Sequence, residues 1–265
     1  MVIDFHTHIF PDKIAQKTIE ILSRRAGLAA YTDGTLGALK RSMAEAGVDI
    51  SVVLPIATKP SQANTINTYA AEITGRDGII SFGSVHPFSP DWKDELDEVY
   101  SLGLKGIKLH PDYQEFYVDD ETVFPVIEYA KSLGLIIVFH SGFDIGLPEP
   151  VHCTPDRAKR LVDAVGGGNL VFAHTGGYER WDEVCEHLVG LDVYFDISFT
   201  LGKLSDKKLL EIITNHGVKK CLFATDSPWG IQKDDVEAAA RLGLQKDDYN
   251  DIMYNNAARL LGLTQ

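Results

Sequence analysis

Cysteine is scarce in this chain of 265 residues, and no C-x-x-C spacing occurs among its three cysteines, Cys153, Cys185 and Cys221. The pattern argues against a disulfide framework and predicts reduced thiols in a cytoplasmic protein. No apolar run approaches the ~20 residues that a membrane-spanning helix needs. We expect no signal peptide, because two histidines, His6 and His8, stand where its charged leading segment would be.

Basic residues are few relative to acidic ones. Lysine and arginine total 25, whereas aspartate and glutamate total 38, which gives a net charge of −13 at pH 7. A general nucleic-acid-binding surface would need a basic stripe and is therefore not expected. A locally basic pocket for a small anion is compatible with this charge. We expect a small-molecule substrate, anionic in one reading, no nucleic-acid or membrane partner, and either a monomer or a homodimer.

The chain also lacks low-complexity segments, linkers and breaks in composition. Its length is typical of one eight-unit α/β barrel, and its apolar fraction of 45% is ample for a large core. The sequence therefore predicts a single domain over residues 1–265.

Short apolar runs recur along the chain with regular spacing. Each is rich in β-branched or aromatic residues and becomes polar only at its far end, which is typical of strands buried on both faces of a parallel sheet. The eight runs span residues 2–6, 50–56, 79–85, 105–110, 135–140, 169–174, 193–198 and 221–226.

Between these runs lie amphipathic segments of helical period, at residues 36–47, 119–134, 154–166 and 205–217. Thr154 and Ser205 are predicted N-caps, and glycines such as Gly47 stand where helices end. Two histidines fall inside helical segments, and we expect His187 and His216 to be surface or packing residues.

Eight strands that alternate with helices predict a (β/α)8 TIM barrel. The rival is a doubly wound open sheet, which rarely needs eight such even units. Two features depart from the plain repeat. We expect an insertion at 9–34 after the first strand, with a helix at 11–26, and an extra helix near 247–262 that closes the barrel.

Histidines collect at the C-terminal ends of the predicted strands, where a barrel places its active site. His6 and His8 alternate on the first strand and so project to one face, as two metal ligands must. Asp226 ends the last strand. Imidazoles with one carboxylate suit a zinc-like ion that keeps one position open for water. The histidines at strand ends are His6, His8, His86, His110, His140 and His174.

Four motifs, DFHTH, FHSG, FAHTGG and FATDSPWG, follow one another on the first, fifth, sixth and eighth strands. Together they resemble the amidohydrolase superfamily, and more narrowly its amidohydrolase-2 branch, which includes aminocarboxymuconate semialdehyde decarboxylase and related hydrolases and hydratases. The resemblance implies that His174 faces the substrate or the metal-bound water. Manganese or iron fits the same ligands as zinc. The implied ligands of one zinc ion are His6, His8, His140 and Asp226.

Lys108 lies on the strand where binuclear members of the superfamily carry a carbamylated lysine that bridges two metals. The branch resembled here usually runs on one metal. We therefore favour a role for Lys108 and His110 in binding a substrate carboxylate or phosphate. Trp229 and His152, in loops that follow strands, are further predicted substrate-binding residues.

Two neighbouring families also begin with a paired histidine motif. TatD-like nucleases carry a glutamate on the fourth strand, where this chain has KGIKLHP. The polymerase-and-histidinol-phosphatase family has Asp-x-His on the eighth strand, whereas Asp226 is followed here by Ser227 and Pro228. The chain therefore lacks one expected metal ligand of each of these two families. TatD-like phosphodiester cleavage ranks second among the hydrolytic options.

The motifs favour a metal-dependent hydrolase of a small amide, ester or lactone. In this interpretation the ion lowers the pKa of bound water toward ~7, Asp226 takes its proton, and His174 or the metal polarises the carbonyl. The main alternative is a metal-dependent lyase, a decarboxylase or hydratase of a small carboxylic acid. A third reading is a metal-binding protein without turnover, which would not need both Asp226 and His174. The fold does not choose the substrate.

Overall fold

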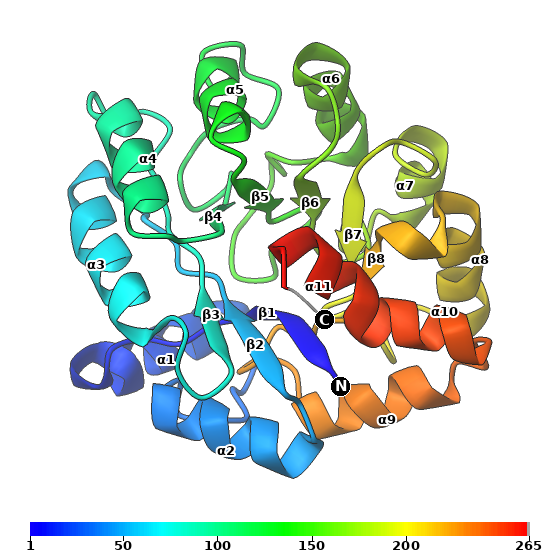
Figure 1. Ribbon diagram of the computed structural model, residues 1–265. Helices are drawn as coiled ribbons and strands as arrows, with labels where there is room; N and C mark the ends of the chain where they lie inside the picture. The colour runs from blue at the N-terminus through cyan, green and yellow to red at the C-terminus, as the bar shows by residue number, and fades with distance from the viewer. Residues whose placement is uncertain (264–265) are drawn as a thin grey trace.

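The computed structural model describes residues 1–263; residues 264 and 265, which the predicted domain includes, lie outside the described part. Within residues 1–263, eight parallel strands form an inner ring that helices surround (Figure 1). Hydrogen-bonded neighbours follow chain order from β1 to β3 and from β4 to β8. The strands are β1 (Ile3–Thr7), β2 (Ile50–Val53), β3 (Ile79–Ser81), β4 (Gly106–Leu109), β5 (Ile136–Phe139), β6 (Leu170–Phe172), β7 (Tyr194–Asp196) and β8 (Cys221–Leu222).

Backbone hydrogen bonds join these two runs of strands into a closed ring. Gly83 N–H, just after β3, donates to Gly106 O of β4 over 2.8 Å. On the other side, Phe5 N–H of β1 donates to Phe223 O, just after β8, over 2.9 Å. A doubly wound open sheet would leave its two outer strands unpaired on one side. The predicted (β/α)8 barrel is therefore confirmed.

The outer ring consists of helices that follow the strands in turn (Figure 1). The predicted helix at 119–134 begins later than expected, because Pro125 has no N–H to donate and fits only a first helical turn. The helices and 3-10 turns before the C-terminal segment are α1 (Asp12–Ala26), α2 (Leu36–Ala46), η1 (Pro60–Gln62), α3 (Ala63–Ile73), α4 (Trp92–Ser101), α5 (Phe124–Ser132), α6 (Pro155–Val165), α7 (Trp181–His187), α8 (Asp206–His216), η2 (Val218–Lys220) and α9 (Gln232–Arg241).

The predicted strands are in the right places but extend past the observed ends. The run at 221–226 gives a strand of only Cys221–Leu222. Asp226, at its far end, has a φ of 64°, in the left-handed region that a strand cannot use. The chain therefore leaves strand geometry where it enters the predicted site.

The two predicted N-caps differ in the structure. Ser205 Oγ accepts a hydrogen bond from Lys208 N–H (3.3 Å), so this cap is confirmed. The Thr154 hydroxyl instead donates to Asp156 Oδ1 over 2.5 Å and makes no side-chain cap bond to the helix. Thr154 nonetheless occupies the N-cap position in extended backbone, with Pro155 in the first turn, so the predicted position is confirmed and only the side-chain cap bond is absent.

The C-terminal segment closes one end of the barrel. The predicted helix at 247–262 is confirmed as three consecutive helical pieces. Residues of the last piece pack against strand residues such as Ile3 and Phe5 inside the ring, and it lies across the ring near the N-terminus (Figure 1). The N-terminal end of the strands is thus covered. The pieces are α10 (Lys246–Asn250), the π-helical η3 (Asp251–Asn255) and α11 (Asn256–Leu261).

Two further sequence expectations concern membranes and thiols. No helix among residues 1–263 combines the length and the apolar character needed to cross a membrane. All three cysteines are free thiols, as their spacing predicted.

His216, the last residue of α8, is a buried packing residue, as predicted. Its ring stacks on Phe195 at 3.8 Å between centroids. Its Nε2 lies 2.9 Å from Val193 O, and its Nδ1 accepts from Gly190 N–H over 3.2 Å. The neutral imidazole satisfies both partners, whereas a proton on Nδ1 would break the bond from Gly190. Burial accordingly lowers the pKa of His216 from 6.5 to about 4.

We predict that His216 makes the fold less stable in acid. The unfolded chain takes up a proton near pH 6.5 and the folded chain only near pH 4, so this group's contribution falls as the pH drops through that window. At pH 7 the full contribution of His216 to the free energy of unfolding is about 3 kcal/mol. Urea unfolding from pH 7 to pH 4 should give a flatter stability curve for His216→Gln, which keeps an acceptor and a donor. Parallel curves for the two proteins would contradict the assignment.

Candidate metal centre

The join between β1 and β8 is fixed by a buried carboxyl group. Asp4 accepts hydrogen bonds from Thr225 N–H (3.0 Å), Thr225 Oγ1 (2.6 Å) and Gln232 Nε2 (2.7 Å). Burial raises the pKa of Asp4 to about 7 against these bonds, which favour the ionised form. Asp226 N–H also donates to His6 O over 2.8 Å. The backbone that carries the histidine pair is thereby held beside the loop after β8.

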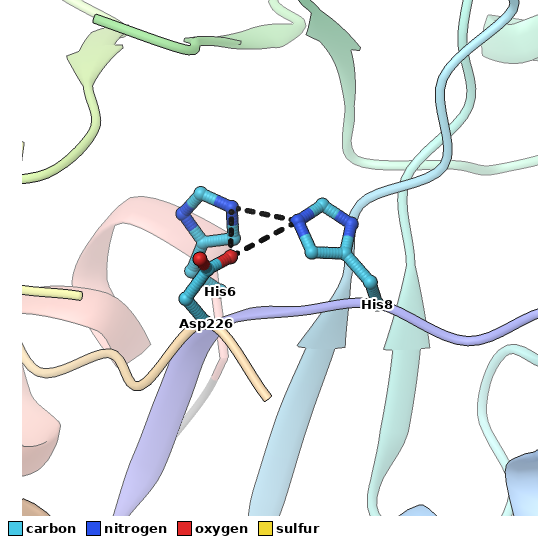
Figure 2. A group of neighbouring side chains, drawn as sticks. All are labelled: His6, His8 and Asp226. Atoms are coloured by element: carbon cyan, nitrogen blue, oxygen red, sulfur yellow. Dashed lines mark hydrogen bonds and ion pairs between the residues drawn. The ribbon is translucent and has the colours of Figure 1, made fainter. Parts of the chain in front are cut away.

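Three predicted ligands converge at this join (Figure 2). His6 Nε2 and His8 Nε2 are 3.1 Å apart. Asp226 Oδ1 lies 3.3 Å from His6 Nε2 and 3.2 Å from His8 Nε2. The histidines come from β1 and the residue just after it, and the carboxylate comes from the loop after β8.

The second nitrogen of each imidazole decides what faces the centre. His8 Nδ1 lies 2.9 Å from Leu54 O, and His6 Nδ1 lies 2.9 Å from Asp196 Oδ2. A carbonyl and a carboxylate only accept, so both Nδ1 atoms carry the proton. Both Nε2 atoms therefore direct lone pairs at each other and at Asp226. Metal-bound histidines typically donate their other N–H to a carbonyl or carboxylate in this way.

This donor set fits a divalent cation. Burial, and after it the charge of Lys108, lowers the pKa of His6 to about 3, so its ring is neutral. Burial opposes ionisation of Asp226, but the neighbouring His8, His6 and His174 hold its pKa at about 2. Two neutral nitrogens and one carboxylate oxygen thus meet. Two tetrahedral ligands at ~2.1 Å from one ion are ~3.4 Å apart, close to the observed separations.

His140, the fourth implied ligand, lies outside this group. The ligand atoms of His6, His8 and Asp226 are all within 4.8 Å of one another, and His140 is not among them. His140 Nδ1 is instead 3.1 Å from His174 Nε2. His140 Nε2 is buried and has no hydrogen-bond partner among the described residues. A buried nitrogen without a partner is costly in a closed protein and is suited to a missing ligand.

Asp196 and Ser198 support the centre, although the sequence analysis did not single them out. The Asp196 carboxylate accepts from His6 Nδ1, from His174 N–H (3.1 Å) and from the Ser198 hydroxyl. Burial opposes ionisation, but the charge and hydrogen bond of His6 keep the pKa of Asp196 well below its usual range. The available signal in the sequence was the alternate placement of Asp196 and Ser198 at the end of the seventh strand, which directs both side chains to one face.

Lys108 stands directly behind the histidine pair. Its Nζ lies 3.3 Å from His6 Nε2, and its side chain is fully buried. Burial lowers the pKa of Lys108 to about 8. An amine in this place can bind an anionic group of a ligand or donate a hydrogen bond to one.

A second polar cluster lies beside the first. His110 and His140 stack with centroids 4.0 Å apart, and His110 Nε2 is 3.2 Å from Asp144 Oδ2. His110 Nδ1 accepts from Tyr113 N–H over 3.3 Å, so Nε2 carries the proton and faces Asp144. The protonated Nε2 has no free lone pair to offer to a metal ion.

One cavity of about 580 Å³ opens onto these residues. Lys108, His110 and Trp229, three predicted substrate-binding residues, line it. The fourth, His152, is not among the lining residues, because its ring packs on Tyr117 with centroids 4.5 Å apart and its Nδ1 faces Pro111 O at 3.1 Å. Most of the predicted rim therefore faces a single cavity.

The backbone is strained where it delivers the site residues. His174, Thr175 and Asp226 have φ angles of 58°, 57° and 64°, values that residues other than glycine rarely adopt. Such conformations cluster at functional sites and persist only where the surrounding structure holds them. Here Asp196 binds His174 N–H and β1 binds Asp226 N–H.

Solved structures of similar fold cover nearly the whole chain. 5-Carboxyvanillate decarboxylase from Sphingomonas paucimobilis is 16% identical, with a TM-score of 0.74 and 99% of each chain covered. Dihydroxybenzoic acid decarboxylase from Polaromonas sp. JS666, solved with manganese and the inhibitor 2-nitroresorcinol, is 15% identical, with a TM-score of 0.74 over 100% of this chain and 97% of that chain. An uncharacterised TIM-barrel protein from Bordetella bronchiseptica is 18% identical, with a TM-score of 0.77 and 98% of each chain covered.

A search of curated proteins finds no match. The family model of the amidohydrolases, in its second branch, matches residues 3–263, which include all four motifs that carry the resemblance. With the converging ligands and the closed barrel, the match leads to one conclusion: the chain belongs to the amidohydrolase family of metal-dependent enzymes.

Proposed function

We propose that this protein is a metal-dependent decarboxylase, a lyase that removes CO2 from a small carboxylic acid. The observation that carries the proposal is the set of lone pairs of His6, His8 and Asp226, with the buried amine of Lys108 beside it in one cavity. The sequence favoured a hydrolase and kept the lyase as its alternative. Full-length likeness to decarboxylases that act on carboxylated phenols now supports the alternative.

His6, His8 and Asp226 would hold one divalent ion, and His140 is the proposed fourth ligand through its unpartnered Nε2. Zinc fits this set, and so does manganese, which a structural relative contains. When bound, the ion supplies Lewis-acid polarisation of a substrate oxygen.

The remaining steps belong to side chains. Lys108 binds the anionic group of the substrate, and His174, held by Ser198 and His140, orients it. The carbon–carbon bond to the carboxylate breaks, CO2 leaves, and the carbon that keeps the electron pair takes a proton. Asp226 is the proposed carrier of that proton, because its carboxylate lines the cavity, where it can take a proton from water and pass it to the carbon.

Hydrolysis is the second candidate, and the position of Asp226 favours it. A carboxylate that stays ionised beside a metal ion can take the proton of an attacking water. The same residues therefore support either reaction, and the product distinguishes them.

The first prediction concerns that product. We expect metal-loaded protein to convert a carboxylated phenol, with 2,6-dihydroxybenzoate and 5-carboxyvanillate as starting probes, to the phenol and CO2. Mass spectrometry of the product and a coupled CO2 assay measure this outcome. Release of an acid with an amine or alcohol from amide, ester or lactone probes, without CO2 release from any carboxylated probe, would replace the lyase with the hydrolase.

The second prediction concerns metal binding. His8→Ala removes one lone pair and leaves only Leu54 O without its partner, so we expect the fold to persist while bound metal and turnover fall to background. Elemental analysis of protein purified without chelator, together with circular dichroism, measures both. The matched control is His187→Ala in α7, a half-exposed histidine far from the cavity lining. Full metal content in His8→Ala would refute the ligand assignment.

The third prediction separates the two roles considered for Lys108. As an anion-binding group, Lys108→Met should reduce kcat/KM by about 10- to 100-fold and leave one metal per chain. If Lys108 is instead a carbamylated bridge between two metal ions, the substitution should lower the metal content below two ions per chain. Lys105→Met, an exposed lysine just before the same strand, is the control and should change neither value.

A further inference from the structure

α1 has an apolar face that the protein buries only in part. Ile14, Thr18, Leu22 and Ala26 are spaced four residues apart and so share one side of the helix. An amphipathic surface helix normally packs its apolar stripe on the core. In α1, however, only Ala15 is buried, and Ile14 remains 50% exposed. Core packing therefore does not account for this stripe.

The stripe faces the catalytic cavity. All four of its residues line the cavity that also contains His6, His8 and Asp226. α3 and the chain before it supply the facing wall, with Ile56, Ile66 and Tyr69. α1 and α3 lie on the same side of the barrel (Figure 1). One continuous space thus runs from the candidate metal centre to a gap between two helices.

Charge is unevenly distributed along this space, whose uncharged part also includes polar side chains such as Thr58, Gln62 and Thr65. The charged lining residues, Lys108, Asp144 and Asp226, all belong to loops and strands at the metal end. Among the described residues that line the cavity, those at 9–28 and 54–69 carry no charge. A volume of about 580 Å³ is in the range that holds drug-sized ligands, well beyond the needs of a single-ring acid.

We propose that the substrate is an amphiphilic acid whose extended apolar tail lies between α1 and α3 while its reacting head lies at the metal centre. The name apolar arm is used here for the cavity wall made by Ile14, Leu22, Ala26, Ile66 and Tyr69. This inference rests on the proposed function for the position of the head. It adds the chemical class of the rest of the substrate, which neither the motifs nor the ligand set supplies.

Straight-chain hydroxamates, from acetohydroxamate to decanohydroxamate, test the arm by isothermal titration calorimetry on metal-loaded protein. The hydroxamate group chelates a metal ion, so chain length probes the arm alone. We expect the dissociation constant to fall by up to about fourfold for each methylene until the arm is full. A flat series in which acetohydroxamate still binds would overturn the apolar arm and leave the proposed function intact.

Two neighbouring residues of α1 provide a matched pair of variants. Leu22→Asp places a charge in the arm and should abolish the chain-length dependence without weakening acetohydroxamate. Ile21→Asp, next to it but outside the cavity lining and 45% exposed, should behave as the parent. If both variants lose the dependence, the tail binds elsewhere and the proposal fails.

A second variant keeps the test decisive if Leu22→Asp does not fold. Ala26→Phe adds bulk to the arm, so affinity should stop rising at a shorter chain than in the parent. Binding of long chains that depends on Leu22, without any binding of acetohydroxamate, would support the arm and count against the metal-centred head. Absence of binding by every hydroxamate would overturn both.

Discussion

The hydrogen-bonded join between β1 and β8 is the constraint on which the candidate centre depends. His6 and His8 belong to the first strand of the chain and Asp226 to the loop after the last, so their atoms meet only if the barrel closes in the correct register. Asp4 fixes that register, because its carboxyl group takes donors from Thr225 and from Gln232 of α9. A one-residue slip would turn the histidine pair to the other face of the strand. Folding of the barrel and assembly of the metal ligands are therefore one event.

The acceptors that surround the candidate centre fix the protonation of the histidines within it. The Asp196 carboxylate holds the proton on His6 Nδ1, and Leu54 O does the same for His8. These partners direct both Nε2 lone pairs to the point that Asp226 also faces, and burial keeps the His6 ring neutral. A cluster of buried acceptors with one negative charge is poorly stabilised by the chain alone. The buried amine of Lys108 offsets part of that charge, and a divalent cation would offset the rest.

The sequence predicted the barrel because each strand is an apolar run that ends in a polar residue, a pattern set by burial on both faces. It also singled out His6, His8 and Asp226, which the structure brings together, since the residues at strand ends in a barrel share one rim. Asp196 was missed because its partner His6 is 190 positions away, and such a pair is visible only once the ring is closed. The position of His140, beside His174 and outside the ligand group, depends on side-chain rotamers that no residue pattern encodes.

The sequence pattern could not predict that the apolar stripe of α1 lines the cavity. A helical period of apolar residues shows which face is apolar, but not whether that face meets the core or a cavity. The pattern at residues 11–26 therefore predicts a helix without showing what its apolar face meets, and in the structure only Ala15 of α1 is buried. The chemistry resides on strand ends that the closed barrel holds rigidly, whereas the apolar wall comes from a helix that contributes little to the core. Substitutions in α1 can thus alter what the cavity accepts while the barrel and its ligands stay in place, which is how one fold serves many substrates.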